Sequence, residues 1–469
     1  MTREHRTRPW LSFEVARVTI QFESAFLLGT GEGDGVHDAV FAADANGLPT
    51  LPGDSIAGVL RHAMAEGADP AEDELCRQVF GYQHRNEGDS SAVRISWAQV
   101  HNSEDKPVAF RGASCKDAVL EFLAAGVMRD HVRIGPHGAV YGRGKFDELV
   151  VPAGARFTFE VVVDERSPRR ASDLVGLLAS RPMRIGRAGR RGLGRFRVVK
   201  VRARTFDLRQ EEDRRLYAKL PVALEDGDAG VLENMGVEAA RAAPRWVHGV
   251  IRLAAVDTWL VGGAVPSGRE PERKEKGWDR FPMTESSIVW AKESGGKEHG
   301  KVVEGKEAPF LVPASGVKGA LRHRTAFHAR RLSQHWMGDS EVEATPEECE
   351  LFGEVKNSSR GRPGRLMIGD ARVAVTTPYA ALQHVSLDRF TQGPRDGLLF
   401  DELVLHGGAV DLDVDLRTDG LSRVARRAIA AALEDLCHER LSLGAGRAGG
   451  RFRGAVHWDD DGRWIQEEP

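Results

Sequence analysis

Cysteine is scarce in this chain, with four residues among 469. None of the four belongs to a C-x-x-C pair, so the sequence argues against a structural zinc site and favours reduced thiols. Long apolar runs are also missing, because none approaches the ~20 residues that a membrane-spanning helix needs. The first residues lack the apolar core of a signal peptide. We therefore expect a cytoplasmic protein with no membrane partner.

The chain also lacks an overall excess of one charge. Its formal net charge is −3 at pH 7, whereas nucleic-acid-binding proteins are often basic. The apolar fraction, 41%, is ordinary for a globular protein, so the chain can bury large cores. This composition disfavours a uniformly basic surface but permits a local one.

A local basic stretch does occur at residues 181–204, which hold ten basic residues and no acidic one. Its centre, residues 184–197, is rich in glycine and arginine and leads into an alternating segment that predicts a strand. Glycine allows close backbone approach to a ligand, and arginine matches phosphate geometry. The stretch is neither a Walker loop, which needs Gly-Lys-Ser/Thr, nor a dinucleotide fingerprint, which needs a following helix. It is either a phosphate-binding loop or a solvated basic turn.

The same pattern occurs twice in the chain. Residues 194–197, Gly-Arg-Phe-Arg, reappear at 450–453. Four more pairs keep the same order, with offsets between 253 and 272 residues: Pro52 with Pro313, Phe80-Gly81 with Phe352-Gly353, His131-Val132 with His384-Val385, and Phe146-Asp147-Glu148 with Phe400-Asp401-Glu402. A nearly constant offset over five ordered pairs indicates one domain that is present twice.

Each half predicts the order strand, helix, strand, strand, helix, strand, which is typical of a ferredoxin-like or RNA-recognition-type unit. The strands are expected at 14–22, 93–100, 157–163 and 196–201, with helices at 54–64 and 172–178. In the second half, strands start near residues 246, 365, 410 and 451, and helices span 315–331 and 421–440. The sequence thus predicts an α+β protein with domains at 1–203 and 246–469 and a linker at 204–245. Insertions are expected at 101–152 and 262–308.

This combination resembles the repeat-associated mysterious proteins, the RAMP superfamily of CRISPR systems. The resemblance rests on the Gly-Arg loop before the last strand and on the helix starts at Pro52 and Pro313. Residues near 101–152 and 376–404 are similar to the thumb hairpin of type III backbone subunits. The resemblance implies a tandem backbone subunit that binds CRISPR RNA and target RNA together with other effector subunits.

The resemblance also implies a catalytic aspartate in the loop after the first strand. Asp38 is the best match, with Glu32, Asp34 and His37 as neighbouring alternatives. A carboxylate near a kinked phosphodiester can bind Mg²⁺ or another divalent cation, or help to move the 2′-hydroxyl proton. The structural alternative is that Asp38 caps a turn.

The second half departs from this pattern. Residues 286–290 stand at the expected place and contain no aspartate. Asp279 could substitute, but its spacing to the following helix differs. We therefore expect a dead or weaker second site, and a long loop that contacts a neighbouring subunit instead.

Predicted RNA contacts lie at helix starts, where N–H groups favour phosphate, in the Gly-Arg loops and at the thumb bases. They are Ser55, Arg61, Ser315, Lys318 and Arg322; Arg187, Arg190, Arg191, Arg195, Arg447 and Arg451; and His131 and His384. The alternative for Arg61 and Arg322 is a structural salt bridge, and for the two histidines an ordinary surface position.

Three functions remain open from the sequence. The first is a guide-binding subunit that cleaves target RNA with a divalent cation. The second is a guide-binding scaffold without catalysis, and the third is a metal-independent CRISPR RNA-processing endoribonuclease. The thumb-like insertions argue against the third.

Overall fold

The computed structural model describes residues 11–466 except for several short segments. The segments outside the description are 32, 66–68, 86, 110–115, 136–139, 181, 241–244, 264–267, 269, 271–276, 293–295, 335–343, 357–359, 375 and 445–448. Among the helices of the described part, none combines the length and apolar character needed to span a membrane.

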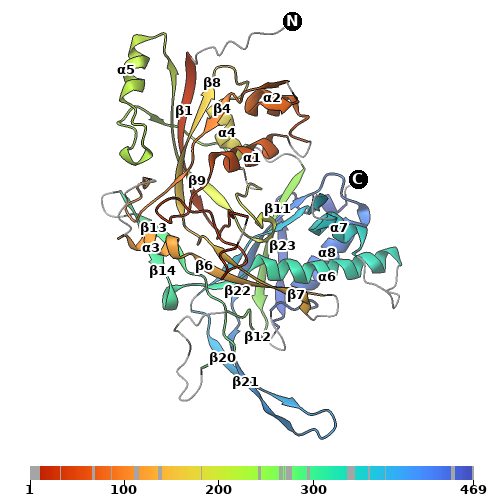
Figure 1. Ribbon diagram of the computed structural model, residues 1–469. Coiled ribbons are helices and arrows are strands. Elements are labelled where there is room, and N and C mark those ends of the chain that lie inside the picture. The colour runs from red at the N-terminus through yellow and green to blue at the C-terminus, as the bar shows by residue number, and fades with distance from the viewer. Residues whose placement is uncertain are drawn as a thin grey trace.

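The first domain is built on an antiparallel sheet that contains both long and short strands. Its central strand β1 (Ser12–Phe22) pairs with β8 (Arg156–Asp164) on one side and β9 (Phe196–Asp207) on the other. Two short strands, β4 (Val93–Ile95) and β5 (Gln99–Val100), pair with β8, so the predicted strand at 93–100 is interrupted. The order β9-β1-β8-β4 is that of a ferredoxin-like unit (Figure 1).

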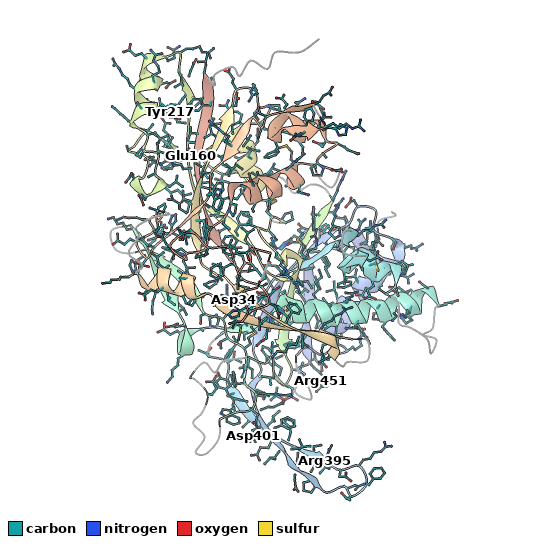
Figure 2. All side chains as sticks on the ribbon, in the orientation of Figure 1. Asp34, Glu160, Tyr217, Arg395, Asp401 and Arg451 are labelled. Atoms are coloured by element: carbon teal, nitrogen blue, oxygen red, sulfur yellow. The ribbon has the colours of Figure 1, made fainter. Side chains whose placement is uncertain are left out.

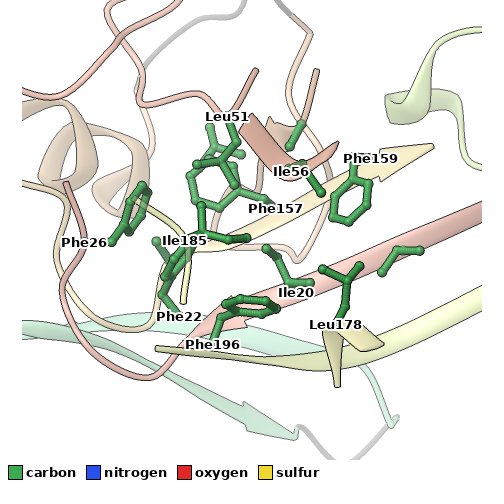
Figure 3. Close-up of a cluster of buried hydrophobic side chains, with 14 of the residues drawn as sticks. Ile20, Phe22, Phe26, Leu51, Ile56, Phe157, Phe159, Leu178, Ile185 and Phe196 are labelled. Carbon is green, nitrogen blue, oxygen red and sulfur yellow. The ribbon is translucent and has the colours of Figure 1, made fainter. Parts of the chain in front are cut away.

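Helices α1 (Gly53–Met64) and α4 (Ala171–Leu178) pack on this sheet. The core beneath them gathers aromatic side chains at the end of β1, as Figure 3 shows. Phe22 and Phe26 stack with ring centroids 3.8 Å apart, and Phe157 meets both edge-on. Each such buried side chain contributes about 1.5–3 kcal/mol. This anchor fixes where the loop after β1 leaves the core.

The predicted linker is partly built into the first domain. Helix α5 (Glu211–Lys219) and the short strand β10 (Glu233–Asn234) follow β9, and β10 pairs with β9 as an added edge strand. Tyr217 of α5 packs edge-on against Phe13 and Phe206. The first domain therefore extends beyond the predicted boundary at 203.

The second domain repeats the first sheet. Strand β11 (Trp246–Ala255) lies between β22 (Ala409–Arg417) and β23 (Phe452–Trp458), and β18 (Leu366–Ile368) pairs with β22. The order β18-β22-β11-β23 matches the first domain strand for strand. Helices α6 (Ala314–Ser333) and α8 (Arg423–Cys437) cover it. The two-domain ferredoxin-like fold predicted from the sequence is confirmed.

Smaller elements are also duplicated. Helix α2 (Glu74–Phe80) precedes a short hairpin, β2 (Tyr82–His84) and β3 (Glu87–Asp89). Helix α7 (Pro346–Phe352) likewise precedes β16 (Gly353–Lys356) and β17 (Arg360–Pro363). Both helices end at a glycine with positive φ, Gly81 and Gly353, which explains the repeated Phe-Gly pair. Strands β15 (Phe310–Val312) and β19 (Ala371–Val373) pair beside the second sheet.

Each domain also carries a long β-hairpin at the predicted thumb. In the first, helix α3 (Ala118–Ala125) leads into β6 (Val127–Ile134) and β7 (Val140–Val150). In the second, β20 (Tyr379–Leu387) pairs with β21 (Pro394–His406), and the short β12 (Thr258–Trp259) joins at the base. The second hairpin projects far from the body of the molecule (Figure 1).

The long loop of the second domain contains a hairpin that packs on the first domain. Strands β13 (Ser287–Lys292) and β14 (Glu298–Val303) pair with each other. The backbone N–H of Ile288 donates to Ala153 O at 2.9 Å, and Trp290 Nε1 donates to Gly154 O at 2.8 Å. Strands β13 and β14 therefore join the two domains, and contact of the long loop with a neighbouring subunit stays a prediction.

Candidate RNA-binding and cleavage site

Asp38 lies at the base of the first hairpin. The loop after β1 returns to strand β7, where Ala39 forms a parallel bridge with Glu148. This places Asp38 beside Asp147. The backbone N–H of Asp38 donates to Asp147 Oδ1 at 2.9 Å, and the N–H of Asp147 donates to Asp38 Oδ2 at 3.0 Å. The reciprocal pair engages one oxygen of each carboxylate.

The alternative residue Asp34 shapes the turn before Asp38. Its carboxylate accepts hydrogen bonds from the backbone N–H groups of Val36 and His37 and from His37 Nδ1 at 3.1 Å. These bonds, led by the His37 backbone bond, lower the pKa of Asp34 to about 2. Asp34 therefore holds the turn and orients His37, which leaves Asp38 as the stronger catalytic candidate. Glu32 lies outside the described residues.

Asp279 occupies the matching place in the second domain. Its neighbour Arg280 forms a parallel bridge with Glu402, as Ala39 does with Glu148. The backbone N–H of Asp401 donates to Asp279 Oδ2 at 2.9 Å. The expectation that residues 286–290 correspond to Asp38 is wrong, because most of them belong to the inserted strand β13. That insertion lengthens the spacing from Asp279 to the helix without moving the aspartate away from the hairpin.

The thumb-base histidines also occupy equivalent places. His131 stacks on Phe146 across the first hairpin, with ring centroids 5.0 Å apart, and His384 stacks on Phe400 at 4.8 Å. Both pairs have an interplanar angle of 21°. The histidine side chains are only 11% and 15% exposed, so they are not ordinary surface positions. RNA contact by either one stays a prediction.

A cavity of about 1230 Å³ lies where the two domains meet. The starts of α1 and α6 and the first Gly-Arg loop border it, and neither Pro52 nor Pro313 at the helix N-caps offers a side-chain cap. Helix starts and guanidinium groups both favour phosphate. Six of the predicted RNA contacts line this cavity: Ser55, Arg190, Arg191, Ser315, Lys318 and Arg322. We call it the interdomain groove.

Lys318 forms part of the floor of the groove. Its Nζ donates to Leu366 O at 2.7 Å and to Arg190 O at 3.0 Å, so it fastens the first Gly-Arg loop to the second domain. Arg190 Nε in turn donates to Gly364 O at 2.7 Å. Burial, followed by the nearby Arg190, Arg191 and Arg322, lowers the pKa of Lys318 to about 7.

The remaining first-loop and helix arginines have protein partners. Arg195 pairs with Glu23 and with Asp413 of the second domain. Arg322 pairs with Glu348, which is the salt bridge given as its alternative, whereas Arg61 donates to the backbone carbonyl of Pro70, which is not a salt bridge. Arg187 is 56% exposed and lies 3.7 Å from Glu148. RNA binding by these residues stays a prediction.

The residues of the second Gly-Arg loop that the structure describes lie outside the groove. Arg451 is half exposed and 3.8 Å from Glu439, and Arg447 lies outside the described residues. No residue of this loop lines the groove in the part of the chain that the structure describes. The described residues of the two loops therefore do not share one groove. Figure 2 shows Arg451 near the side from which the second hairpin, with Asp401 at its base, projects.

Sequence reasoning missed the buried charges between the domains. Arg129 of β6 is 3% exposed and pairs with Asp370 at 2.7 Å and with Glu285. Arg184 pairs with Asp415 at 3.0 Å. These residues are far apart in the chain, and only the domain packing brings them together.

A divalent cation would have few protein ligands here. The described residues contain no group of three His, Cys, Asp or Glu side chains arranged for a metal ion. Mg²⁺, however, is usually held by one or two carboxylates together with water and substrate phosphates. Asp38 and Asp147 could serve as these two carboxylates, because their reciprocal hydrogen bonds use only one oxygen of each.

Comparisons with known proteins place the chain in a family. The model of the RAMP superfamily matches residues 19–197 and 252–453, one match in each domain. No curated protein matches the chain. One similar solved structure is described as a cryo-EM structure of the type III-B Cmr-beta bound to cognate target RNA; it is 16% identical with a TM-score of 0.30, and the match covers 41% of this chain and 61% of that chain. The chain belongs to the RAMP superfamily and contains the family domain twice.

Proposed function

We propose that this protein is a cytoplasmic backbone subunit of a type III CRISPR RNA-guided effector complex. It binds CRISPR RNA in the interdomain groove and cleaves complementary target RNA at two sites, one at each hairpin base. The second site replaces the dead or weaker site that we expected from the sequence, because Asp279 lies at the second hairpin base as Asp38 does at the first. Its other partners are further subunits of the effector. The observation that carries the proposal is the repeated pairing of Asp38 with Asp147 and of Asp279 with Asp401.

The groove suits a guide of any sequence. Its polar lining consists mainly of arginine, lysine and serine side chains, together with His62 and Glu354. Contacts of arginine, lysine and serine with phosphate and sugar carry no sequence information. Such binding weakens with salt, since it depends on release of counterions. This is the property that a subunit must have if it accepts many guides.

The aspartates supply the chemistry in this proposal. Asp38 and Asp279 are held by backbone N–H groups of their hairpins, so each carboxylate has a fixed direction. A fixed carboxylate can assist removal of the 2′-hydroxyl proton from a correctly positioned strand. Mg²⁺ bound with Asp38 and Asp147, or with their counterparts, would stabilise charge on the phosphate.

The proposal is tested in the assembled complex with a guide and a labelled target. Asp38→Asn and Asp279→Asn keep the hydrogen-bond acceptor for the hairpin N–H and remove the charge. We expect each variant to lose one set of cuts and the double variant to lose all cuts, with guide retention unchanged. If the double variant still cut the target at every site, the two aspartates would not be catalytic and this chain would keep only a scaffold function. Cleavage that survives EDTA would favour the processing endoribonuclease.

A further inference from the structure

Each hairpin base contains a buried carboxylate that the proposed chemistry does not use. Glu148 and Glu402 directly follow Asp147 and Asp401, and each is only 1% exposed. Glu148 Oε2 lies 3.3 Å from His131 Nε2. In the second hairpin, the equivalent atoms of Glu402 and His384 are 3.1 Å apart. A buried carboxylate is costly unless it is paired, so its presence at both sites calls for a reason.

The cation at each glutamate comes from a different part of the chain. Glu148 has Arg187 at 3.7 Å and Arg191 at 3.8 Å, both from the first Gly-Arg loop. Glu402 has Arg280 at 2.8 Å, which immediately follows Asp279. Among the described residues, both glutamates thus have a guanidinium group beside them, and the arginines come from different segments in the two domains.

The guanidinium groups also cover the aromatic ring of each hairpin base. Arg191 lies 5.9 Å from the centre of the Phe146 ring, and Arg280 lies 5.4 Å from the centre of the Phe400 ring. Burial raises the pKa of Glu148, but His131, Arg191 and Arg187 lower it further, so the pKa falls below its ordinary value. In the first hairpin base, Glu148 is therefore a charged carboxylate with the guanidinium groups of Arg187 and Arg191 beside it.

Both glutamates lie at the point where the aspartate loop meets the hairpin. The bridges of Ala39 with Glu148 and of Arg280 with Glu402 are the contacts that set the position of the preceding aspartate. The N–H of the residue after each glutamate, Leu149 or Leu403, donates to the loop at 2.9 Å. A shift of the glutamate would therefore shift the aspartate as well.

We propose that Glu148 and Glu402 are positioning residues that fix Asp38 and Asp279 relative to the bound RNA. Glu148 also connects the first cleavage site to the guide-binding loop through Arg187 and Arg191. The cation beside Glu402 is instead Arg280, in the loop that holds Asp279. The first site is thus coupled to the guide loop, and the second is coupled to the loop that holds Asp279. This inference rests on the proposed function.

The test uses Glu148→Gln and Glu402→Gln in the assembled complex, because glutamine keeps the volume and removes the charge. We expect Glu148→Gln to lower the rate of the Asp38-dependent cuts by up to about 100-fold, since a misplacement of about 1 Å has that effect. Target affinity and the Asp279-dependent cuts should not change. Glu402→Gln should show the opposite pattern.

A second variant guards against misfolding. Arg187 is exposed, so Arg187→Gln should fold. Because Arg187 is also a predicted RNA contact, guide occupancy is measured first, and at equal occupancy the variant should slow only the Asp38-dependent cuts. Glu121→Gln, at an exposed position on α3, serves as the matched control and should change neither set.

The outcomes separate the two proposals. If Asp38→Asn and Asp279→Asn leave their cuts intact, the proposed function fails, and the positioning role fails with it. If those variants abolish their cuts but Glu148→Gln and Arg187→Gln leave them at the normal rate, the positioning role alone is overturned. An equal loss at both sites in Glu148→Gln, with a raised KM for target, would show a general structural role and would also overturn it.

Discussion

Lys318 of the second domain donates a hydrogen bond to the backbone carbonyl of Arg190 in the first domain, at 3.0 Å. The contact places a buried ammonium directly beneath the loop that we assign to guide binding. It also means that the shape of this loop depends on the presence of the second domain. A tandem chain can therefore fix its first groove within one molecule.

The lowered pKa of Lys318 predicts a pH dependence of stability. The folded chain has a pKa of about 7 at this position and the unfolded chain 10.5, so the unfolded chain binds more protons between these values. The free energy of unfolding should therefore rise with pH across this window. Lys318→Met has no titratable group at this position, so its free energy of unfolding should lack this rise with pH. Denaturant unfolding of both proteins between about pH 7 and 10 checks it; parallel pH profiles would contradict it.

Arg129 predicts a large cost for breaking a buried ion pair. Arg129→Met leaves Asp370 buried without this cation and leaves Glu285 with Arg372 as its remaining partner, and loss of a buried partner typically costs about 3–5 kcal/mol. Arg215→Met removes an exposed pair with Glu211 and should cost less than about 1 kcal/mol. Denaturant unfolding compares the two. Equal small losses would mean that the domain junction does not depend on this cluster.

A substitution at Gly154 tests the contact of strand β13 with the first domain, which we call the clasp. It has a φ of +90°, and an added Cβ would overlap the carbonyl oxygen of Ile288. Gly154→Ala should therefore displace strand β13 and raise hydrogen exchange over residues 287–303. Gly47→Ala, with a φ of +76° and open space around it, controls for the backbone conformation alone. If exchange in the clasp is the same in both variants, the clasp does not rest on this contact.

The sequence was sufficient for the fold because its signals were local and occurred twice. Alternating strands and the ordered pairs, the two Phe-Gly pairs included, predicted both domains. The position of Asp279 could not be predicted by counting residues, because the inserted hairpin changes its distance to α6. It depends instead on the bridge between its neighbour Arg280 and Glu402, residues more than a hundred positions apart in the sequence.

The partners of the arginines were also beyond sequence reasoning. The same residue type lines the groove at Arg191, joins the domains at Arg195 and pairs on the surface at Arg451. A guanidinium group fits all three environments, and only tertiary packing decides among them. The sequence alone therefore cannot tell which of these arginines line the groove.

The groove assignment predicts a change in salt dependence. Arg190→Gln and Arg191→Gln together should weaken guide binding and reduce the slope of log affinity against log salt by about 0.7 for each phosphate that is no longer neutralised. Arg451→Gln removes the same type of charge outside the groove and should change the slope less. Filter binding of a single-stranded guide over a range of salt concentrations measures both slopes. An Arg451→Gln slope that falls as far as that of the double variant would show that the guide does not distinguish the groove from the second loop.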